Sequence, residues 1–588
     1  MDKEKNTDTV SQTEFVNAVI QANQRIIRNY LKNYSGYHHD IRDIALTYSS
    51  LITKILVNPM EMMKIYNLNL DFLKTQQNLY QQIFLHPEEK NTSIIEPEKG
   101  DKRFSGTDWN EYPLFNFLKQ NYLLSERLSR KLVDEIEVDE KIRKKLDFYT
   151  AQYMDALSPS NFLLTNPEVL KLAGETNGKS LYDGFDNLVK DIENGRISQT
   201  DESAFEVGKN LATTQGSVIY ENELMQLIQY APLSKKVCEI PLVIIPPWIN
   251  KYYILDLQPK NSLVKFLLEN GITIFMVSWR NPKPGMGNLR LDDYAEKGAI
   301  RAIEIAQNIS GTKKVNTLGY CLGGTLLSIA CSILSGKQNE NPVASASLLA
   351  AMVDFSNIGP MGDAIDGALI RKLERGELLN GGIMNGHNME TAFNLIRAND
   401  LIWNYVVNNY LKGIKPSAFD VLFWTNDNTN LPAKMYVYYM RSMILENKLS
   451  RKNALSICNI PIDIGKINIP VFVIGLKEDI ISPARTGFTT TELVNGPVEF
   501  ILGGSGHVMG VVNPPSKNKY GYYLNGKLGE GFEEWQKTAN FFEGSWWTPW
   551  IERLINLSGK KIPAPSNPGN EKYKVLEPAP GTYVKEKC

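Results

Sequence analysis

Short apolar runs alternate with amphipathic stretches between residues 240 and 350, and this alternation predicts an α/β domain. The strand-like runs lie at residues 240–245, 272–278, 315–318 and 344–349, and apolar residues predominate in most of them. Helical patterns separate them, at residues 262–270, 292–308 and 325–334. Strands with continuous rather than alternating apolar character are typical of a mainly parallel sheet that is buried on both faces. The same strand pattern returns at residues 471–474 and 498–502.

The interruption between these two groups of strands predicts an insertion. Residues 355–468 contain helix-like segments, aromatic residues and polar loops, but no pattern typical of a buried strand. Before the sheet, Met62, Ile65 and Tyr66 are among the apolar residues that recur at helical spacing, which indicates helix packing or a face that touches a hydrophobic surface or partner. We therefore predict a mostly helical domain at residues 1–205. An α/β domain follows at residues 206–588, with a cap insertion at about 355–468.

Charge and cysteine content narrow the class of protein. The 64 Lys and Arg residues nearly balance the 65 Asp and Glu residues, which argues against an electrostatic nucleic-acid binder. The five cysteines show neither a disulfide framework nor the spacing of a metal site, so we expect no metal. The first ten residues lack an apolar signal segment, and no apolar run approaches the length of a membrane span. We expect a cytoplasmic protein with no transmembrane span.

The sharpest local motif is Gly-Tyr-Cys-Leu-Gly-Gly at residues 319–324, between a predicted strand and a predicted helix. This is the context of a nucleophile elbow, in which a sharp turn exposes the nucleophile and small neighbours leave room for the turn. The helix N-terminus favours the thiolate, which is the reactive form of cysteine. Cys321 is therefore the candidate nucleophile. The alternative is a buried structural cysteine beside a glycine-rich turn, and Cys331 is the better example of that.

An elbow of this kind takes its acid and its histidine from later in the chain. His507 follows the strand at 498–502 and is the candidate base, whereas His387 in the cap region is the weaker candidate. Asp479 follows the strand at 471–474 and is the preferred acid, with Asp354 as the fallback. Together Cys321, Asp479 and His507 predict an acyl-transfer enzyme, in which the thiolate attacks an ester or thioester and becomes acylated.

A longer set of motifs resembles the class I poly(3-hydroxyalkanoate) synthases, and the resemblance runs from about residue 104 to 584. It rests on DALSPSNFLLTNPEVL (155–170), PPWINKYYILDL (246–257), GYCLGG (319–324), RANDLIWNYVVNNYLKG (397–413), FD, FW and TNLP pieces (419–432), SGHVMGVVNPP (505–515), GSWWTPW (544–550) and APGTYV (579–584). The chain departs from the family at Ile480, where His is usual, and at Ala484, where Trp is usual. Both departures lie close in sequence to the candidate acid, Asp479.

The resemblance implies an α/β-hydrolase fold and polymerisation of (R)-3-hydroxyacyl-CoA, typically 3-hydroxybutyryl-CoA, with release of CoA. The family's triad falls on Cys321, Asp479 and His507. In this scheme the backbone N–H groups of Leu322 and Trp248 form the oxyanion hole. Arg397 and Asn447 are candidates for substrate binding, with structural ion pairing and capping as the equal alternative.

The resemblance also implies the partners of the protein. These are the hydroxyacyl-CoA substrate, the nascent polyester and the granule surface, with a homodimer as the expected assembly and no cofactor beyond the CoA thioester. The aromatic residues Trp424, Tyr436, Tyr438 and Tyr439 are expected in the core of the cap or along a tunnel. Two other functions remain open: a hydrolase that passes the acyl group to water, and a non-catalytic granule-coating or scaffold protein. The cysteine nucleophile and the large cap favour transfer to an alcohol.

Overall fold

A computed structural model describes residues 48–49, 51–53, 55–85, 93–337, 341–363, 365–376 and 379–588. The chain forms two compact units. The helical unit contains residues up to Asp201 together with Ala392–Ala418, and the sheet unit contains Glu202–Thr391 and Phe419–Cys588. Residues 1–47 of the predicted helical domain lie outside the described residues. In the described part of the chain, no helix has both the length and the apolar character needed to cross a membrane.

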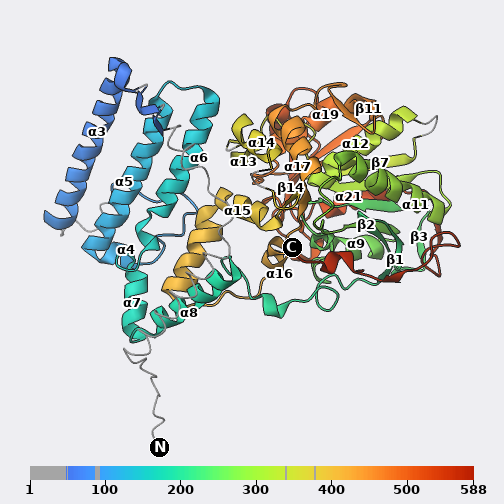
Figure 1. Ribbon diagram of the computed structural model, residues 1–588, viewed down its shortest axis with the longest axis horizontal. Coiled ribbons are helices and arrows are strands. Elements are labelled where there is room, and N and C mark those ends of the chain that lie inside the picture. Colours follow the sequence, from blue (N-terminus) through green and yellow to red (C-terminus); the bar gives the residue numbers. More distant parts are fainter. Residues whose placement is uncertain are drawn as a thin grey trace, which may run out of the picture. The chain divides into compact units, whose positions relative to one another are not determined.

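The sheet unit is built on one mixed sheet of eleven strands (Figure 1). In spatial order these are β15 (Asn540–Phe542), β14 (Tyr522–Leu524), β13 (Val498–Gly503), β12 (Val471–Leu476), β7 (Val343–Leu349), β6 (Val315–Tyr320), β4 (Leu242–Ile245), β5 (Ile274–Trp279), β2 (Met225–Tyr230), β1 (Gly216–Glu221) and β17 (Glu577–Pro578). The six strands from β13 to β5 are parallel, and antiparallel strands extend both edges. Every residue of β4, β5, β6 and β12 is buried, as expected for the centre of a parallel sheet that is covered on both faces.

Helices and short pairs of strands complete the sheet unit. The helices are η3 (Glu202–Ala204), η4 (Tyr252–Asp256), α9 (Leu263–Glu269), α10 (Leu291–Asp293), η5 (Tyr294–Ile300), α11 (Arg301–Ser310), α12 (Leu322–Lys337), α18 (Ala484–Phe488), α19 (Thr490–Leu493), η10 (Pro515–Lys517), α20 (Phe532–Thr538), α21 (Trp547–Asn556) and η11 (Tyr583–Lys585). A separate pair joins β3 (Lys236–Cys238) to β16 (Lys561–Pro563). The helix α21 is anchored to the sheet because the indole N–H of Trp550 donates to the Ser347 hydroxyl on β7 at 2.9 Å.

The inserted segment contains short strands that its sequence pattern did not predict. Its elements in the sheet unit are α13 (Pro360–Asp363), α14 (Gly367–Glu374), β8 (Ile383–Met384), α16 (Asp420–Asn426), β9 (Leu431–Pro432), α17 (Ala433–Tyr439), η8 (Met440–Leu445), β10 (Leu455–Ile457), β11 (Ile460–Ile462) and η9 (Ile464–Lys466). The buried strands β8 and β9 pair with each other, and β10 pairs with β11. The prediction that no buried strand lies here is wrong, because strands of two or three residues are too short to show a period.

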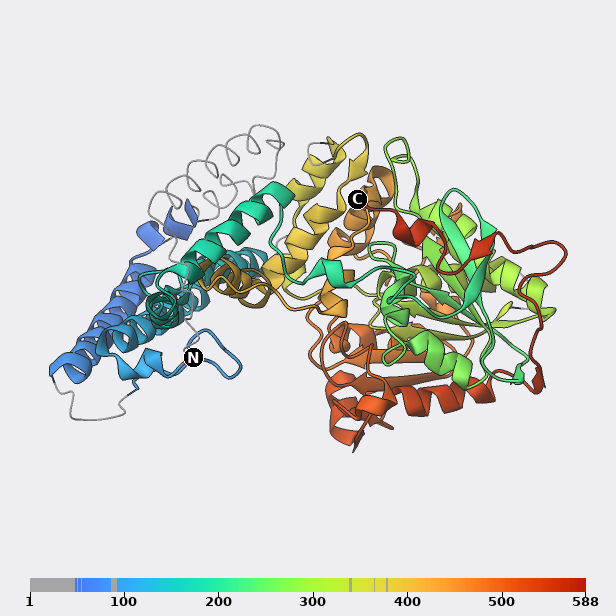
Figure 2. The ribbon, with the colours of Figure 1, turned by 90° about the horizontal axis from the view of Figure 1, so that it is seen from below.

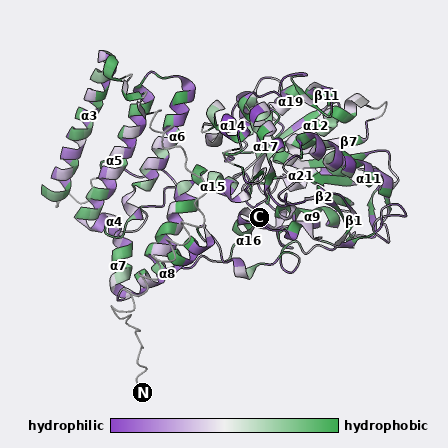
Figure 3. Cartoon of the chain, in the orientation of Figure 1, coloured by the Kyte–Doolittle hydropathy of each residue, from purple (hydrophilic) through white to green (hydrophobic). Residues whose placement is uncertain are grey.

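The helical unit holds long amphipathic helices, and Figure 3 shows hydrophobic and hydrophilic residues alternating along α3 and α5. Its elements are α3 (Pro59–Tyr80), η1 (Gln81–Leu85), α4 (Asp108–Glu111), α5 (Pro113–Glu135), α6 (Glu140–Ala156), η2 (Pro159–Asn161), α7 (Pro167–Glu175), α8 (Lys179–Asn194), η6 (Asn399–Trp403) and η7 (Val406–Leu411). The helix α15 (Gly386–Ile396) begins in the sheet unit and ends in the helical unit. Buried Trp109 and Leu79 belong to the core of the helical unit.

Residues 392–418 leave the predicted cap and pack within the helical unit. Figures 1 and 2 show this segment beside α8, and Gly184 on α8 lies so close to Tyr410 that a Cβ at Gly184 would overlap the Tyr410 carbonyl oxygen. The Gln199 side chain donates to the carbonyl of Leu401 at 2.7 Å, and Asn187 donates to that of Asn409 at 3.1 Å. The assignment of all of 355–468 to a cap on the α/β domain therefore changes. These contacts join residues more than 200 positions apart, and local patterns do not reveal them.

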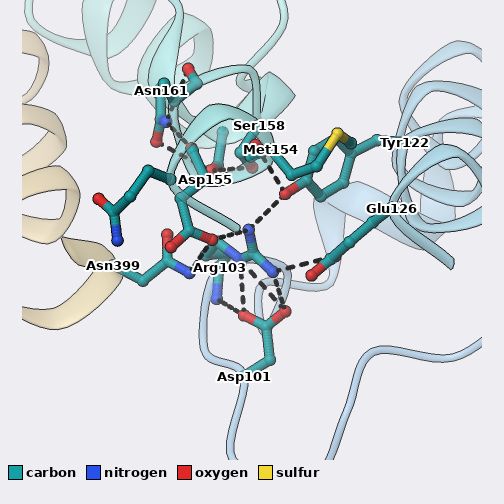
Figure 4. Close-up of polar contacts among 12 residues, drawn as sticks. Asp101, Arg103, Tyr122, Glu126, Met154, Asp155, Ser158, Asn161 and Asn399 are labelled. Atoms are coloured by element: carbon teal, nitrogen blue, oxygen red, sulfur yellow. Dashed lines mark hydrogen bonds and ion pairs between the residues drawn. The ribbon is translucent and has the colours of Figure 1, made fainter. Parts of the chain in front are cut away.

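Arg103 is the centre of a polar cluster that holds this segment (Figure 4). Its side chain is 13% exposed, and it contacts Asp101, Tyr122, Glu126 and Asp155. The Asn399 side chain, from the inserted segment, donates to Asp155 at 2.6 Å. The cluster therefore links α5, the end of α6 and the segment 392–418 through one cation.

We predict that Arg103→Gln destabilises the helical unit. The substitution leaves three carboxylates close together without their cation, and removing one partner of a buried ion pair costs about 3–5 kcal/mol. Urea unfolding followed by protease sensitivity near residues 392–418 measures the loss. Lys179→Gln, which breaks an exposed pair with Asp183 on α8, is the control and should change stability by less than about 1 kcal/mol. Equal stability of the two variants would contradict the role of Arg103.

A second buried charge lies in the sheet unit, on η4. Asp256 is 2% exposed, and its Oδ1 accepts hydrogen bonds from the hydroxyls of Thr214 and Ser262, each at 2.6 Å. No described residue donates a hydrogen bond to its Oδ2. Burial raises the pKa of Asp256 to about 6, and the two hydroxyl hydrogen bonds oppose this increase. The folded protein therefore binds the proton of Asp256 more tightly than the unfolded chain does.

This raised pKa predicts a pH dependence of stability. The contribution of Asp256 to stability is highest below about pH 4, falls as the pH rises through the window up to about 6, and stays low above it. A shift of this size corresponds to about 3 kcal/mol. We expect Asp256→Asn to be more stable than the natural protein at pH 7.5 and to lose this advantage near pH 4. Urea unfolding at both pH values measures the difference in the free energy of unfolding. Glu206→Gln, at an exposed carboxylate, is the control. An advantage that does not change with pH would contradict the assignment.

Candidate active site

Cys321 lies at the turn between β6 and α12. Its backbone φ is +51°, in the left-handed region that is costly for a residue with a Cβ. Its N–H donates to the Leu349 carbonyl on β7 at 2.8 Å, and its own carbonyl accepts from the Gly324 N–H at 2.9 Å. The turn is thus held from both sides, and its strained backbone is the feature that marks a nucleophile elbow.

The glycines around Cys321 are required by close backbone contacts. A Cβ on Gly319 would overlap the backbone of Gly324, and a Cβ on Gly323 would overlap the carbonyl oxygen of Ile245 at the end of β4. Only glycine lets the strand, the turn and the helix approach this closely. The contact with Ile245 also places the loop that follows β4 directly beside the elbow.

His507 and Asp479 form a buried pair on the loops that follow β13 and β12. The His507 Nδ1 and the Asp479 Oδ2 are 2.7 Å apart, and their side chains are 9% and 0% exposed. The other carboxylate oxygen, Oδ1, accepts from the backbone N–H groups of Ile481 at 2.9 Å and Ser482 at 2.8 Å. Both oxygens of Asp479 are therefore engaged, which sets the orientation of the carboxylate and, through it, of the imidazole ring.

The electrostatics of the pair extend to Cys321. Burial by itself lowers the pKa of His507, but the charges of Asp479 and Cys321, and hydrogen bonds to both side chains, raise that pKa well above its usual value. Because Asp479 occupies Nδ1, Nε2 is the ring nitrogen that remains for the thiol. The buried His507–Asp479 contact and the raised pKa of His507 are what the predicted acyl-transfer triad requires of its acid and base, and the role of Cys321 as nucleophile stays a prediction.

Comparison with known proteins identifies the family of the chain. A model described as the poly-beta-hydroxybutyrate polymerase (PhaC) N-terminus matches residues 100–267, and one described as the alpha/beta hydrolase fold matches residues 240–514. The poly(3-hydroxyalkanoate) polymerase subunit PhaC of Cupriavidus necator is 45% identical over 494 residues, which are 83% of each chain. The poly(3-hydroxyalkanoate) polymerase of Methylorubrum extorquens is 41% identical over 501 residues, 84% of this chain and 82% of its own. The chain belongs to the poly(3-hydroxyalkanoate) polymerase family. The predicted resemblance and fold class are confirmed.

Of the two residues predicted to form the oxyanion hole, Leu322 belongs to the elbow and Trp248 to the loop beside it. Leu322 is the first residue of α12, immediately after Cys321. Trp248 is buried in the loop after β4, and its ring lies 5.9 Å from that of Tyr439 and 6.1 Å from that of Tyr294. The close contact of Gly323 with Ile245 brings this loop beside the elbow. The role of their N–H groups stays a prediction.

Two tyrosines of the polymerase flank the triad without having been predicted as site residues. The Tyr320 ring stacks on the His507 ring with centroids 5.5 Å apart, and its hydroxyl donates to the His507 carbonyl at 3.4 Å. Burial, and then the charge of Cys321, raises the pKa of Tyr439 well above its usual value, and the Tyr439 ring lies 5.9 Å from the ring of Trp248 in the loop beside the elbow. From the sequence, Tyr439 was expected in the cap core or along a tunnel. For Tyr320, the only feature of the sequence that could have indicated a role in the site is its position next to Cys321.

The alternative triad residues have other partners. Asp354 Oδ1 accepts from the Asn447 side chain at 2.8 Å and from the Ser356 N–H at 2.7 Å. His387 Nδ1 lies 3.2 Å from Glu390 Oε2, and the histidine side chain is half-exposed. Among the described residues, the carboxylate that contacts the His507 ring is that of Asp479. The geometry therefore favours Asp479 over Asp354.

The two predicted substrate-binding residues are in different units. Asn447 has a backbone φ of +44°, accepts from the Phe355 N–H at 2.8 Å and donates to Asp354, so its side chain joins the start of the cap to the turn that follows η8. Arg397 lies in the helical unit, where it forms an exposed ion pair with Asp400. The contacts of Asn447 are those expected of a structural capping residue, and the contact of Arg397 is that expected of a structural ion pair. Substrate binding by either residue stays a prediction.

The departures from the family pattern lie beside Asp479 in sequence. Ile480 is 36% exposed, and its backbone carbonyl is packed so closely against Gly359 that a Cβ there would overlap it. Ala484 is buried at the start of α18, where its methyl group lies close to Gly475 of β12. With Ile480 and Ala484 at these positions, the carboxylate of Asp479 still contacts the Ile481 N–H and His507.

Proposed function

We propose that this polymerase elongates polyester from (R)-3-hydroxyacyl-CoA, with 3-hydroxybutyryl-CoA as the main substrate, through an acyl-Cys321 intermediate. The observation that carries the proposal is the buried His507–Asp479 pair on a cysteine elbow, with the pKa of His507 raised. The names of the relatives support the product class, a poly(3-hydroxyalkanoate). The CoA thioester is the substrate, and the scheme needs no further cofactor or metal.

The proposed reaction has two acyl transfers. In the first, His507 takes the thiol proton, the Cys321 thiolate attacks the thioester carbonyl, and CoA leaves with the proton from His507. The N–H groups of Leu322 and Trp248 stabilise the oxyanion. In the second, the 3-hydroxyl of an acceptor attacks the acyl-cysteine while His507, held by Asp479, takes the hydroxyl proton. The ester bond forms and the thiol of Cys321 is restored, so each cycle adds one unit and releases one CoA.

The test of this function is the fate of the acyl group. Purified protein with 3-hydroxybutyryl-CoA should release CoA and accumulate polymer, with little free 3-hydroxybutyrate. Free hydroxyacid as the main product would instead establish a hydrolase, and absence of thiol release would favour a scaffold protein. Short- and medium-chain hydroxyacyl-CoA substrates compared in the same assay define the accepted side chain.

We also propose that the protein acts in the cytoplasm as a homodimer on the surface of its polymer granule. On α3, Met60, Met63, Tyr66 and Leu73 are more than half exposed, which supports contact with an apolar surface. Replacing Met60 and Met63 by glutamine should weaken co-sedimentation with polymer granules. Sedimentation velocity of the soluble protein measures the dimer separately, and a monomer at all concentrations would contradict that part.

A further inference from the structure

The loop between β4 and η4, residues 246–251, is held at both ends. At its start, the Pro246 carbonyl accepts from the indole N–H of Trp279 at 2.8 Å. At its end, the Lys251 carbonyl accepts from the indole N–H of Trp424 at 2.7 Å, and Asn250 forms a β-bridge with Asn428. The middle of the loop carries Trp248. Its path beside the elbow is therefore set by contacts that do not involve the triad.

A buried ion pair also lies at the end of the loop. Lys251 Nζ and Asp427 Oδ1 are 2.8 Å apart, and their side chains are 3% and 2% exposed. The hydroxyl of Tyr253 donates to the other oxygen of Asp427 at 2.9 Å. Lys587 also contacts Asp427, at 2.7 Å, and Lys251 donates to the Glu586 carbonyl at 2.6 Å. Asp427 thus has three donors. Lys251 and Tyr253 come from the end of this loop and the start of η4, and Lys587 comes from the C-terminal segment.

A buried pair of this kind has little value for stability alone. Burial lowers the pKa of Lys251, and the Asp427 carboxylate opposes that decrease. Desolvation of the two charges offsets much of their attraction, and well-packed apolar residues in such positions are often as stable. The pair does, however, allow few arrangements, because both charges must stay matched. That property suits a contact whose task is to keep a backbone segment in one position.

We propose that Asp427 is a positioning residue for the oxyanion hole, which it serves by holding Lys251 and Tyr253 and thereby the backbone of Trp248. The inference rests on the proposed function, in which the Trp248 N–H stabilises the oxyanion formed at Cys321. Asp427 belongs to the inserted segment, at the end of α16. A residue of the inserted segment would in this way contribute to acylation at Cys321.

The test compares two reactions of the same thiol. Acylation of Cys321 by 3-hydroxybutyryl-CoA passes through an oxyanion, whereas alkylation by iodoacetamide does not. For Asp427→Asn we expect first-turnover acylation to fall by about 10–100-fold, somewhat less than the loss of an oxyanion donor itself. Alkylation of Cys321 and the KM for the thioester should stay within about threefold, since neither depends on the oxyanion hole.

Two further variants keep the test decisive if Asp427→Asn folds poorly. Tyr253→Phe removes one hydrogen bond to Asp427 and should give a smaller loss of acylation in the same direction. Glu374→Gln, which breaks the half-exposed pair with Arg441 in the same unit, should leave both reactions unchanged. Equal losses of acylation and alkylation, or a lowered melting temperature with normal acylation, would overturn the positioning role. Absence of acyl-Cys321 in the natural protein would instead contradict the proposed function.

Discussion

Cys321→Ala should abolish CoA release and polymer formation, a loss of roughly 10⁴-fold or more, because the substitution removes the sulfur on which the proposed acyl-enzyme forms. Cys321→Ser should retain far less activity than the natural protein, since histidine ionises a hydroxyl less readily than a thiol. The elbow tolerates either side chain sterically, because the strain at φ +51° is already present with cysteine. Single-turnover assays with radiolabelled 3-hydroxybutyryl-CoA, followed by peptide mapping, measure both the rate and the site of attachment.

Cys331 offers a matched control on the helix that follows the elbow. It is fully buried on α12, and burial raises its pKa to about 12, so it is inert at neutral pH. Cys331→Ala should therefore retain acylation, apart from a modest loss of stability. Label on the peptide that contains Cys331 or Cys238, with Cys321 unlabelled, would show that the nucleophile has been assigned wrongly.

His507→Gln and Asp479→Asn should separate the two acyl transfers. His507→Gln removes the base that ionises the thiol, and we expect loading of Cys321 to slow by about 10²–10⁴-fold. Asp479→Asn leaves the imidazole but removes the charge that raises the pKa of His507, so that pKa falls. Loading should then be less affected than elongation, in which the pair must take a proton from an alcohol. Rapid-quench measurement of CoA release separates the first turnover from later ones.

The controls for this pair come from the residues considered as alternatives. Asp354→Asn should elongate normally, because the carboxylate of Asp354 contacts Asn447 and the Ser356 N–H. His387→Gln should also be near normal, since that side chain is half-exposed beside Glu390. An Asp479→Asn protein without a first burst of CoA would contradict the division of steps. A severe defect in Asp354→Asn would move the acid to the earlier strand.

Much of the site could be predicted because its parts depend on local sequence. The elbow needs only a strand, a helix and small residues around Cys321, and each leaves a signal within a few positions. Asp479 and His507 follow apolar strands, and parallel strands that are neighbours in a sheet bring their carboxyl ends to one edge. The distance of 2.7 Å between their side chains follows from the pairing of β12 with β13.

Other features of the chain depend on contacts that no local pattern records. The segment 392–418 joins the helical unit because Gly184, Gln199 and Asp155 contact it from positions about 200 or more residues away. The edge strands β14, β15 and β17 have two or three residues and are too short for a hydrophobic period.

The buried ion pair of Lys251 and Asp427 is the clearest example of a feature that the sequence does not reveal. A lysine and an aspartate 176 positions apart carry no sign in the sequence that they form a pair, and their burial alone would be unfavourable. Only the fold brings Lys251 and Asp427 together and compensates each charge with the other. Local sequence thus determined the turn at Cys321 and the strands that carry Asp479 and His507. The tertiary structure decided which distant residues hold these elements in place. Two residues far apart in sequence can stabilise each other only after folding has brought them together.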